Sequence, residues 1–241
     1  MKKFLNIWKL DLTELYQMLL FMLAGGVFGI VFVKIIVSVD STAEGYPVVG
    51  ALIAMVIGLF FTVLADIFSF GTKFNLAVSM SCTRKEFFMM YWIENTSLIA
   101  IEIAAVLGFG FLETQIGRIL YANTSLTEEF NALPYIMDFR IIAALVLLLP
   151  AIGMVFGACI LKFQAKAVWA IWILWMSGFL GLGKISDRIS QNPNSPFARI
   201  LLGIPPFFKT VPVPALVGLF AAAAIFLFMV SFLLLRKQEV K

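Results

Sequence analysis

The stretch FRIIAALVLLLPAIGMVFGACIL, which runs from Phe139 to Leu161, holds one charged residue, Arg140, among its 23 residues. A helix of this length rises about 35 Å at roughly 1.5 Å per residue, which is enough to cross a hydrocarbon core about 30 Å thick. Lipid offers no hydrogen-bond partners to backbone groups, so such a segment must satisfy them within one helix. The stretch therefore predicts a transmembrane span.

Five further stretches of this kind predict an all-α integral membrane protein with six transmembrane helices. Of the 241 residues, 62% are hydrophobic and only 13% are charged. A soluble domain carries about 25% charged residues, so this shortage indicates a surface that faces lipid. We expect one transmembrane domain over residues 1–241, with spans at about 18–39, 47–70, 89–112, 139–161, 167–183 and 211–235.

Two segments outside these spans predict helices at the membrane surface. In residues 1–17, Phe4, Trp8 and Leu12 begin an apolar stripe beside lysines, which is typical of an amphipathic helix lying on a leaflet before the chain turns into the bilayer. Between Lys184 and Thr210, apolar residues at helical spacing predict short outer helices before the last span. An ordinary surface loop fits this second segment equally well.

Lysine and arginine gather in the segments on one side of the expected membrane, which predicts that both termini are cytoplasmic. The third outer segment fits this orientation less well, because it also holds Lys184, Arg188, Arg199 and Lys209. The basic residues of the expected inner side are Lys2, Lys3, Lys9, Lys73, Arg84, Lys85, Lys162, Lys166, Arg236, Lys237 and Lys241.

The residue types needed for several kinds of chemistry are scarce. The chain has no histidine and two cysteines far apart in sequence, which disfavours intramembrane zinc and Ser–His proteases and soft-metal sites. The segment GFLGLGK, Gly178 to Lys184, approaches a phosphate-binding loop, but Ile185 follows where Ser or Thr would hold magnesium. We expect no metal, cofactor or catalytic residue in this chain, and no nucleic-acid partner.

Four ionisable residues fall within the expected spans: Lys34, Asp66, Glu94 and Glu102. A charge in hydrocarbon costs at least about 2.5 kcal/mol, so each residue needs a reason to be there. Lys34 and Asp66 lie near span ends, from which their side chains can reach the interface. We interpret Glu94 as a structural contact between helices. For Glu102, near the middle of its span, a functional role and a structural role remain equal alternatives.

Two glycine pairs predict close helix packing. Gly25 and Gly29 lie four residues apart in the first expected span, and Gly153 and Gly157 repeat this spacing in the fourth. Residues four apart share one helix face, and the missing side chains let a neighbouring backbone approach.

The segment DIFSFGTKFNLAVSMSCTRKEFF, from Asp66 to Phe88, joins the second and third expected spans. The positive-inside rule explains its basic residues but not the run of small polar residues before them. The segment resembles the corresponding part of bacterial ABC-2-type transporter permeases, especially the short Gram-positive ones. The resemblance extends to the layout of the whole chain: a surface helix, six spans, both ends inside, and short outer helices before the last span.

This resemblance implies the transmembrane subunit of an ATP-driven exporter in a bacterial cell membrane. Two copies of a separate ABC ATPase would bind ATP and magnesium, and a second copy of this chain or a close relative would complete the transporter. Amphipathic peptides or lipophilic, drug-like molecules would be the cargo. The expected ATPase-coupling residues, with Phe87 and Phe88 as inserting anchors, are Thr83, Arg84, Lys85, Glu86, Phe87, Phe88, Lys162 and Lys166.

Three other functions fit parts of the sequence. A membrane-embedded substrate-binding component of an uptake system has a similar size, but does not need the segment between the second and third spans. An intramembrane enzyme would have to use Asp66, Glu94 and Glu102 without histidine or a clustered nucleophile. A secondary transporter would be expected to show an inverted repeat, which this sequence does not display convincingly.

Overall fold

The computed structural model describes residues 2–39, 44–80, 82–122, 125–191, 208 and 210–236. Nearly all of these residues are helical, and two short strands occur among them. In chain order the elements are α1 (Lys2–Val39), β1 (Gly45–Val48), α2 (Gly50–Ser79), α3 (Arg84–Leu120), β2 (Thr127–Asn131), α4 (Leu133–Ile136), α5 (Phe139–Phe163), α6 (Ala165–Gln191) and α8 (Val213–Leu235).

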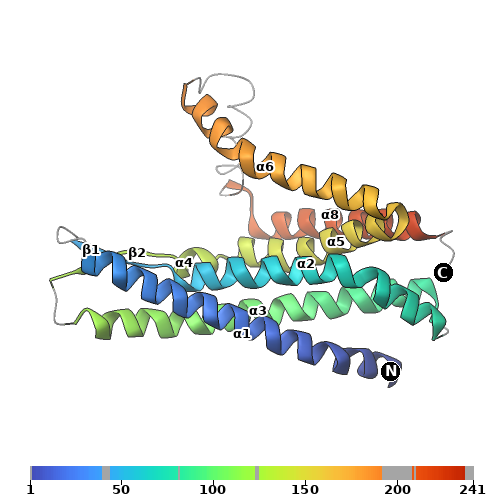
Figure 1. Cartoon of the computed structure of the whole chain (residues 1–241), viewed down its shortest axis with the longest axis horizontal. Helices are drawn as coiled ribbons and strands as arrows, with labels where there is room; N and C mark the ends of the chain where they lie inside the picture. Colours follow the sequence, from blue (N-terminus) through green and yellow to red (C-terminus); the bar gives the residue numbers. More distant parts are fainter. Residues whose placement is uncertain are drawn as a thin grey trace.

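Five long helices, α1, α2, α3, α5 and α8, form one elongated bundle, and α6 diverges from it (Figure 1). The two described chain ends lie at the same end of the bundle as the α2–α3 and α5–α6 connections, and we call this the inner end. The strands and α4 lie at the opposite, outer end. The described part of the chain therefore begins and ends on the same side of the bundle.

The same five helices are long and apolar enough to cross a membrane: Leu15–Val39 of α1, Gly50–Ser79, Arg84–Leu120, Phe139–Phe163 and Val213–Leu235. The chain is an all-α, multi-pass membrane protein, as the sequence predicted. The remaining expected span, 167–183, falls within α6, whose 27 residues are not among these five helices. Six spans therefore stay a prediction.

The helices differ from the expected spans mainly at their ends. Helix α2 continues to Ser79, and α3 begins at Arg84. The connection between them is therefore residues 80–83, much shorter than the loop expected after residue 70. No proline interrupts residues 71–79, so the apolar helix simply extends past the expected boundary. At the other end, α3 runs on to Leu120 rather than stopping near residue 112.

The surface helices are only partly described. Helix α1 is continuous from Lys2 to Val39, so the separate helix expected over 1–17 is instead the first part of one long helix. The expected apolar stripe of this helix begins at Phe4, Trp8 and Leu12, whose side chains are not described. The short outer helices expected between Lys184 and Thr210 also fall largely outside it, because residues 192–207 and 209 are not described.

A two-stranded parallel pairing at the outer end was not expected. Gly45 pairs with Thr127, and Val48 pairs with Asn131, so the connections before α2 and before α4 lie side by side. Strands of four and five residues are too short to show a period in the sequence.

Candidate functional site

The connection between α2 and α3 is organised by a capping box on the first turn of α3. The backbone amide of Thr83 donates to Glu86 Oε2 at 2.9 Å, and the Thr83 hydroxyl accepts from the Glu86 amide at 3.3 Å. These bonds satisfy amides that otherwise have no partner at a helix start. Two of the expected coupling residues therefore fix where α3 begins.

Phe87 and Phe88 point into the bundle, in contrast to the expectation that they insert into a partner. Their exposed fractions are 4% and 0%, and their ring centroids lie 5.7 Å apart in an edge-to-face arrangement. Phe88 also contacts the ring of Phe232 on α8, at 5.7 Å between centroids. The two rings belong to an aromatic cluster that joins α2, α3 and α8, so they cannot serve as anchors for a partner in this conformation.

Arg84 connects the start of α3 to the end of α8. Its guanidinium donates to the Leu235 carbonyl at 3.3 Å and also contacts the Arg236 carbonyl. The last carbonyls of a helix have no partner within it, and a cation there also interacts favourably with the helix dipole. The connection before α3 is therefore held against α8 by Arg84 and by the aromatic cluster.

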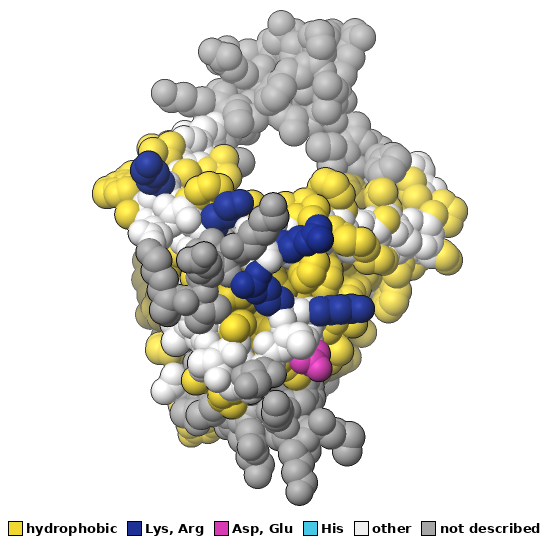
Figure 2. Space-filling view, turned by 90° about the vertical axis from the view of Figure 1, so that its right-hand side faces the viewer, with side chains coloured by type: hydrophobic (Ala, Val, Ile, Leu, Met, Phe, Trp, Pro, Cys, Tyr) yellow, Lys and Arg dark blue, Asp and Glu magenta, His cyan; other side chains and the backbone are white. Residues whose placement is uncertain are grey.

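The inner end carries exposed basic side chains, which we call the inner basic surface: Lys85, Lys162, Lys166 and Arg236. Lys85 lies on the first turn of α3, whereas Lys162 and Lys166 flank the connection between α5 and α6. Figure 2 shows lysine and arginine side chains gathered among apolar ones on this end, with few acidic groups in view. Such a surface attracts acidic partners.

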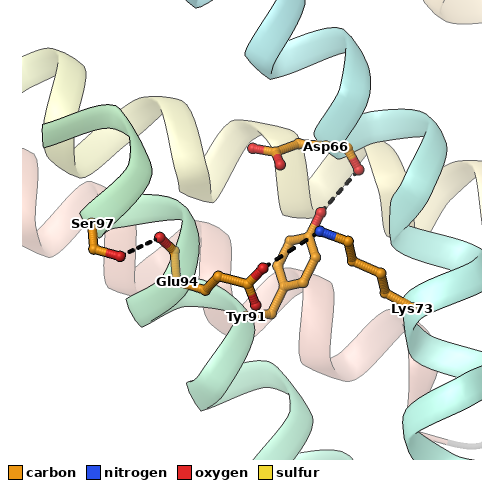
Figure 3. Close-up of polar contacts among 5 residues, drawn as sticks. All are labelled: Asp66, Lys73, Tyr91, Glu94 and Ser97. Carbon is orange, nitrogen blue, oxygen red and sulfur yellow. Dashed lines mark hydrogen bonds and ion pairs between the residues drawn. The ribbon is translucent and has the colours of Figure 1, made fainter. Parts of the chain in front are cut away.

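Asp66, Lys73 and Glu94 lie in a polar contact group between α2 and α3, near the inner end (Figure 3). Lys73 Nζ lies 3.4 Å from Glu94 Oε1, and Tyr91 donates its hydroxyl to the Asp66 carbonyl at 2.9 Å. Glu94 therefore makes the interhelical contact that the sequence suggested. Asp66 was expected to extend toward the interface, but it is buried in the bundle, with 5% of its surface exposed, and its side chain faces Gly153 of α5.

Glu102 lies deeper in the bundle, with no exposed surface. Its Oε1 contacts the hydroxyl of Thr62 on α2, which also lies 3.2 Å from the sulfur of Met18 on α1. Its second carboxylate oxygen has no hydrogen-bond partner among the described residues. Helices α1, α2 and α3 are thus linked by one buried polar contact group. Lys34, by contrast, is exposed on α1.

Glu113 was not singled out from the sequence, which placed it in an outer loop. It lies in α3, is 4% exposed, and accepts hydrogen bonds from the backbone amides of Gly50 at 2.6 Å and Ala51 at 2.7 Å. Helix α2 is preceded by Val49, whose side chain cannot cap it, so a carboxylate from another helix does so. The signal available in the sequence was Val49 at the start of α2, because a helix that lacks a capping side chain of its own needs an acceptor from elsewhere.

Tyr46 and Tyr121 lie beside this cap at the outer end. Their ring centroids are 4.2 Å apart in a stacked arrangement, and together with Glu113 they line a small cavity. Partial burial, and to a lesser extent the neighbouring Tyr46, raises the pKa of the Tyr121 phenol above its usual value. Tyr121 therefore stays protonated over the physiological pH range.

The four predicted packing glycines all face neighbouring side chains or backbone. A Cβ at Gly29 would lie 2.8 Å from the Gly50 Cα, and one at Gly157 would lie 2.5 Å from the Phe70 Cβ. At Gly25 the nearest atom would be the Ile57 Cδ1, at 2.6 Å. Gly153 is looser, with the Asp66 Cβ at 3.4 Å. The first pair thus packs α1 on α2, and the second packs α5 on α2.

The fold defines the class of protein: a multi-pass membrane protein built from a bundle of apolar helices. Comparison with known proteins found no matching family model, no matching curated protein and no matching solved structure. Among the residues that the structure describes, no group of three or more His, Cys, Asp or Glu side chains is arranged to hold a metal ion.

Proposed function

We propose that this chain is the transmembrane subunit of an ATP-driven ABC exporter that works with a separate ATPase subunit. The observation that supports this best is the inner basic surface, in which Lys85 at the start of α3 and Lys162 and Lys166 at the α5–α6 connection are exposed at the same end of the bundle. Opposite charges across an interface steer association and fix its register. An acidic surface on an ATPase would meet both connections at once.

The packing beneath this surface suggests how force would enter the bundle. Arg84 joins the start of α3 to the end of α8, and Phe88 packs between the same two helices. A displacement of the α2–α3 connection would therefore move both helices, because close-packed interiors transmit strain. In this proposal Phe87 and Phe88 transmit force within the bundle instead of inserting into the ATPase. Thr83 and Arg84 hold the α2–α3 connection in shape. The residues that contact the ATPase are then Lys85, Glu86, Lys162 and Lys166.

The exposed apolar surface fits the remaining parts of the proposal. Large hydrophobic side chains are exposed on α1 and α6, among them Phe28, Phe32, Trp169 and Trp172. With α6 as the sixth span, a second copy of the chain or a close relative would pack in the membrane, and amphipathic peptides or lipophilic molecules would pass along their interface. ATP and magnesium would bind to two copies of the ATPase.

Co-purification with the ABC ATPases of the same genome tests this proposal. The double variant Lys85→Glu with Lys166→Glu should lower ATPase recovery at least about tenfold, because it reverses two exposed charges on the proposed docking surface. Arg84 is left unchanged because it holds α8. Lys34→Glu, an exposed charge reversal far from the inner end, is the matched control and should leave recovery unchanged.

If the double variant inserts normally and recovers the same amount of ATPase, the docking assignment is wrong. Orientation is tested separately with a Cys159→Ser background, in which Cys82 beside the α2–α3 connection is the remaining thiol. A membrane-impermeant maleimide should modify Cys82 only after the cells are opened. Modification in intact cells would place the basic surface outside and remove the basis for ATPase coupling.

A further inference from the structure

A hydrophobic groove separates α5 from α6 near the inner end. Its cavity measures about 350 Å³, within the size range of roughly 300–1,000 Å³ that is typical of small-molecule sites. The walls include Phe156, Cys159, Phe163, Ala170 and Leu174, and Lys166 lies among them. The groove therefore combines an apolar lining with one basic side chain.

The connection between the two helices explains why the groove exists. Only Gln164 separates Phe163, the last residue of α5, from Ala165, the first of α6, and its φ of 52° lies in the left-handed region. A residue with a side chain adopts this conformation at a cost, so the surrounding structure must impose it. The resulting sharp turn sends α6 away from the bundle (Figure 1), and the groove lies between the two diverging helices.

The basic groups lie beside the Gln164 turn. Lys166 lines the groove on the first turn of α6, and Lys162 lies on the last turn of α5, with its amine 5.5 Å from the centre of the Phe163 ring. Both lysines are exposed, and no described acidic residue lines the cavity. Apolar walls with one lysine in the lining and a second beside the Phe163 ring match a molecule with a hydrocarbon chain and a negatively charged head.

We propose that this groove binds an anionic phospholipid from the leaflet at the inner end, with one acyl chain between α5 and α6 and its phosphate on Lys162 and Lys166. Basic pockets between transmembrane helices are known to hold anionic head groups, and the acyl chain fills apolar space that neither helix covers. The inference goes beyond the proposed transport function and does not require the ATPase. It does require that the open side of α6 face the bilayer.

Native mass spectrometry of the purified full chain tests the site with two lipids of identical acyl chains, phosphatidylglycerol and phosphatidylcholine. We expect phosphatidylglycerol to remain bound and to be preferred by roughly tenfold or more, as two lysines near an anionic head group predict. Lys162→Gln with Lys166→Gln should remove this preference. Lys85→Gln, an exposed lysine of the same end that does not line the groove, should keep it.

A second measurement follows the groove itself through the Cys159 thiol in a Cys82→Ser background. Phosphatidylglycerol should slow the alkylation of Cys159 by a lipid-soluble maleimide at least about fivefold in the parent, and much less in the lysine double variant. Ala170→Phe, or the milder Ala170→Leu, should fill the cavity and reduce binding of the lipid. Either substitution places its side chain on a surface that is already exposed, so the bundle should still fold.

Three results would overturn the proposal. Equal binding of the two lipids would remove the role of the head group. A preference for phosphatidylglycerol that survives in the lysine double variant would move the site elsewhere. Protection of Cys159 that depends on protein concentration rather than on lipid would show that a second copy of the chain occupies the groove.

Discussion

Glu113 of α3 caps α2 by accepting a hydrogen bond from the backbone amide of Gly50 at 2.6 Å. The same carboxylate accepts from Ala51, so one side chain serves two amides at the start of a helix 63 residues away in sequence. The contact fixes the relative heights of α2 and α3 at the outer end.

Removing this cap should destabilise the protein. Glu113→Ala leaves two buried amides without their acceptor, and we expect a loss of about 2 kcal/mol or more in the free energy of unfolding. Glu113→Gln keeps one carbonyl oxygen as an acceptor and should lose less. Thermal or SDS unfolding in detergent measures both. Glu128→Ala, an exposed acid on β2, is the control, and equal losses for Glu113→Ala and this control would exclude the capping role.

Gly29→Ala should weaken the packing of α1 on α2. The added Cβ would lie 2.8 Å from the Gly50 Cα, and because backbone atoms cannot move away easily, we expect a loss of about 1–3 kcal/mol. Gly108→Ala is the matched control, since no atom lies within 4 Å of its new Cβ. That substitution should be neutral or stabilise α3 by up to about 1 kcal/mol. Similar unfolding curves for the two variants would contradict the close approach of α1 and α2.

Phe88→Ala separates a packing role from a docking role. Phe88 has no exposed surface, so truncation should cost about 3–5 kcal/mol through lost contacts and a cavity in the aromatic cluster. Lys85→Ala, three residues earlier and exposed, should change stability by less than about 0.5 kcal/mol. If Phe88→Ala instead leaves unfolding unchanged and lowers ATPase recovery, then Phe88 is exposed in the assembled protein.

The ion pair between Lys73 and Glu94 gives a fourth prediction. Replacing Lys73 with Met leaves a carboxylate that is 3% exposed without its cation, which should cost about 2 kcal/mol. This value is below the roughly 3–5 kcal/mol of a fully buried pair, because the Lys73 side chain is 17% exposed. Adding Glu94→Gln to Lys73→Met should restore part of the stability. A purely additive double-mutant cycle would show that the two charges do not interact.

Sequence reasoning found the membrane class and most of the helices because long apolar runs are a local signal. It placed the helix ends poorly for a physical reason. Lys73 was counted as a loop residue by the positive-inside rule, whereas in the structure it lies inside α2 and is accommodated there by Glu94. Which charges a span tolerates depends on partners from other helices, and these are not visible in one sequence.

The candidate site was predicted unevenly for the same reason. The basic residues of the inner end were found from the distribution of Lys and Arg among the connecting segments, and Lys85, Lys162 and Lys166 are exposed in the structure. Whether Phe87 and Phe88 face a partner or the core depends on the position of α8, which follows them by more than a hundred residues. Glu113 was missed because its role depends on the start of another helix.

Helix α3 has a mechanical consequence for the whole molecule. Its 37 residues form one unbroken rod about 55 Å long, which begins at the capping box and Arg84 and reaches Glu113 and the paired strands at its far end. A rigid rod pivoting about its middle moves its two ends in opposite directions, so a tilt of about 5° would shift each end by roughly 2 Å. Movement of the α3 end on one face of the membrane toward the bundle axis would thus move the other end of α3 away from that axis, with no hinge in the helix.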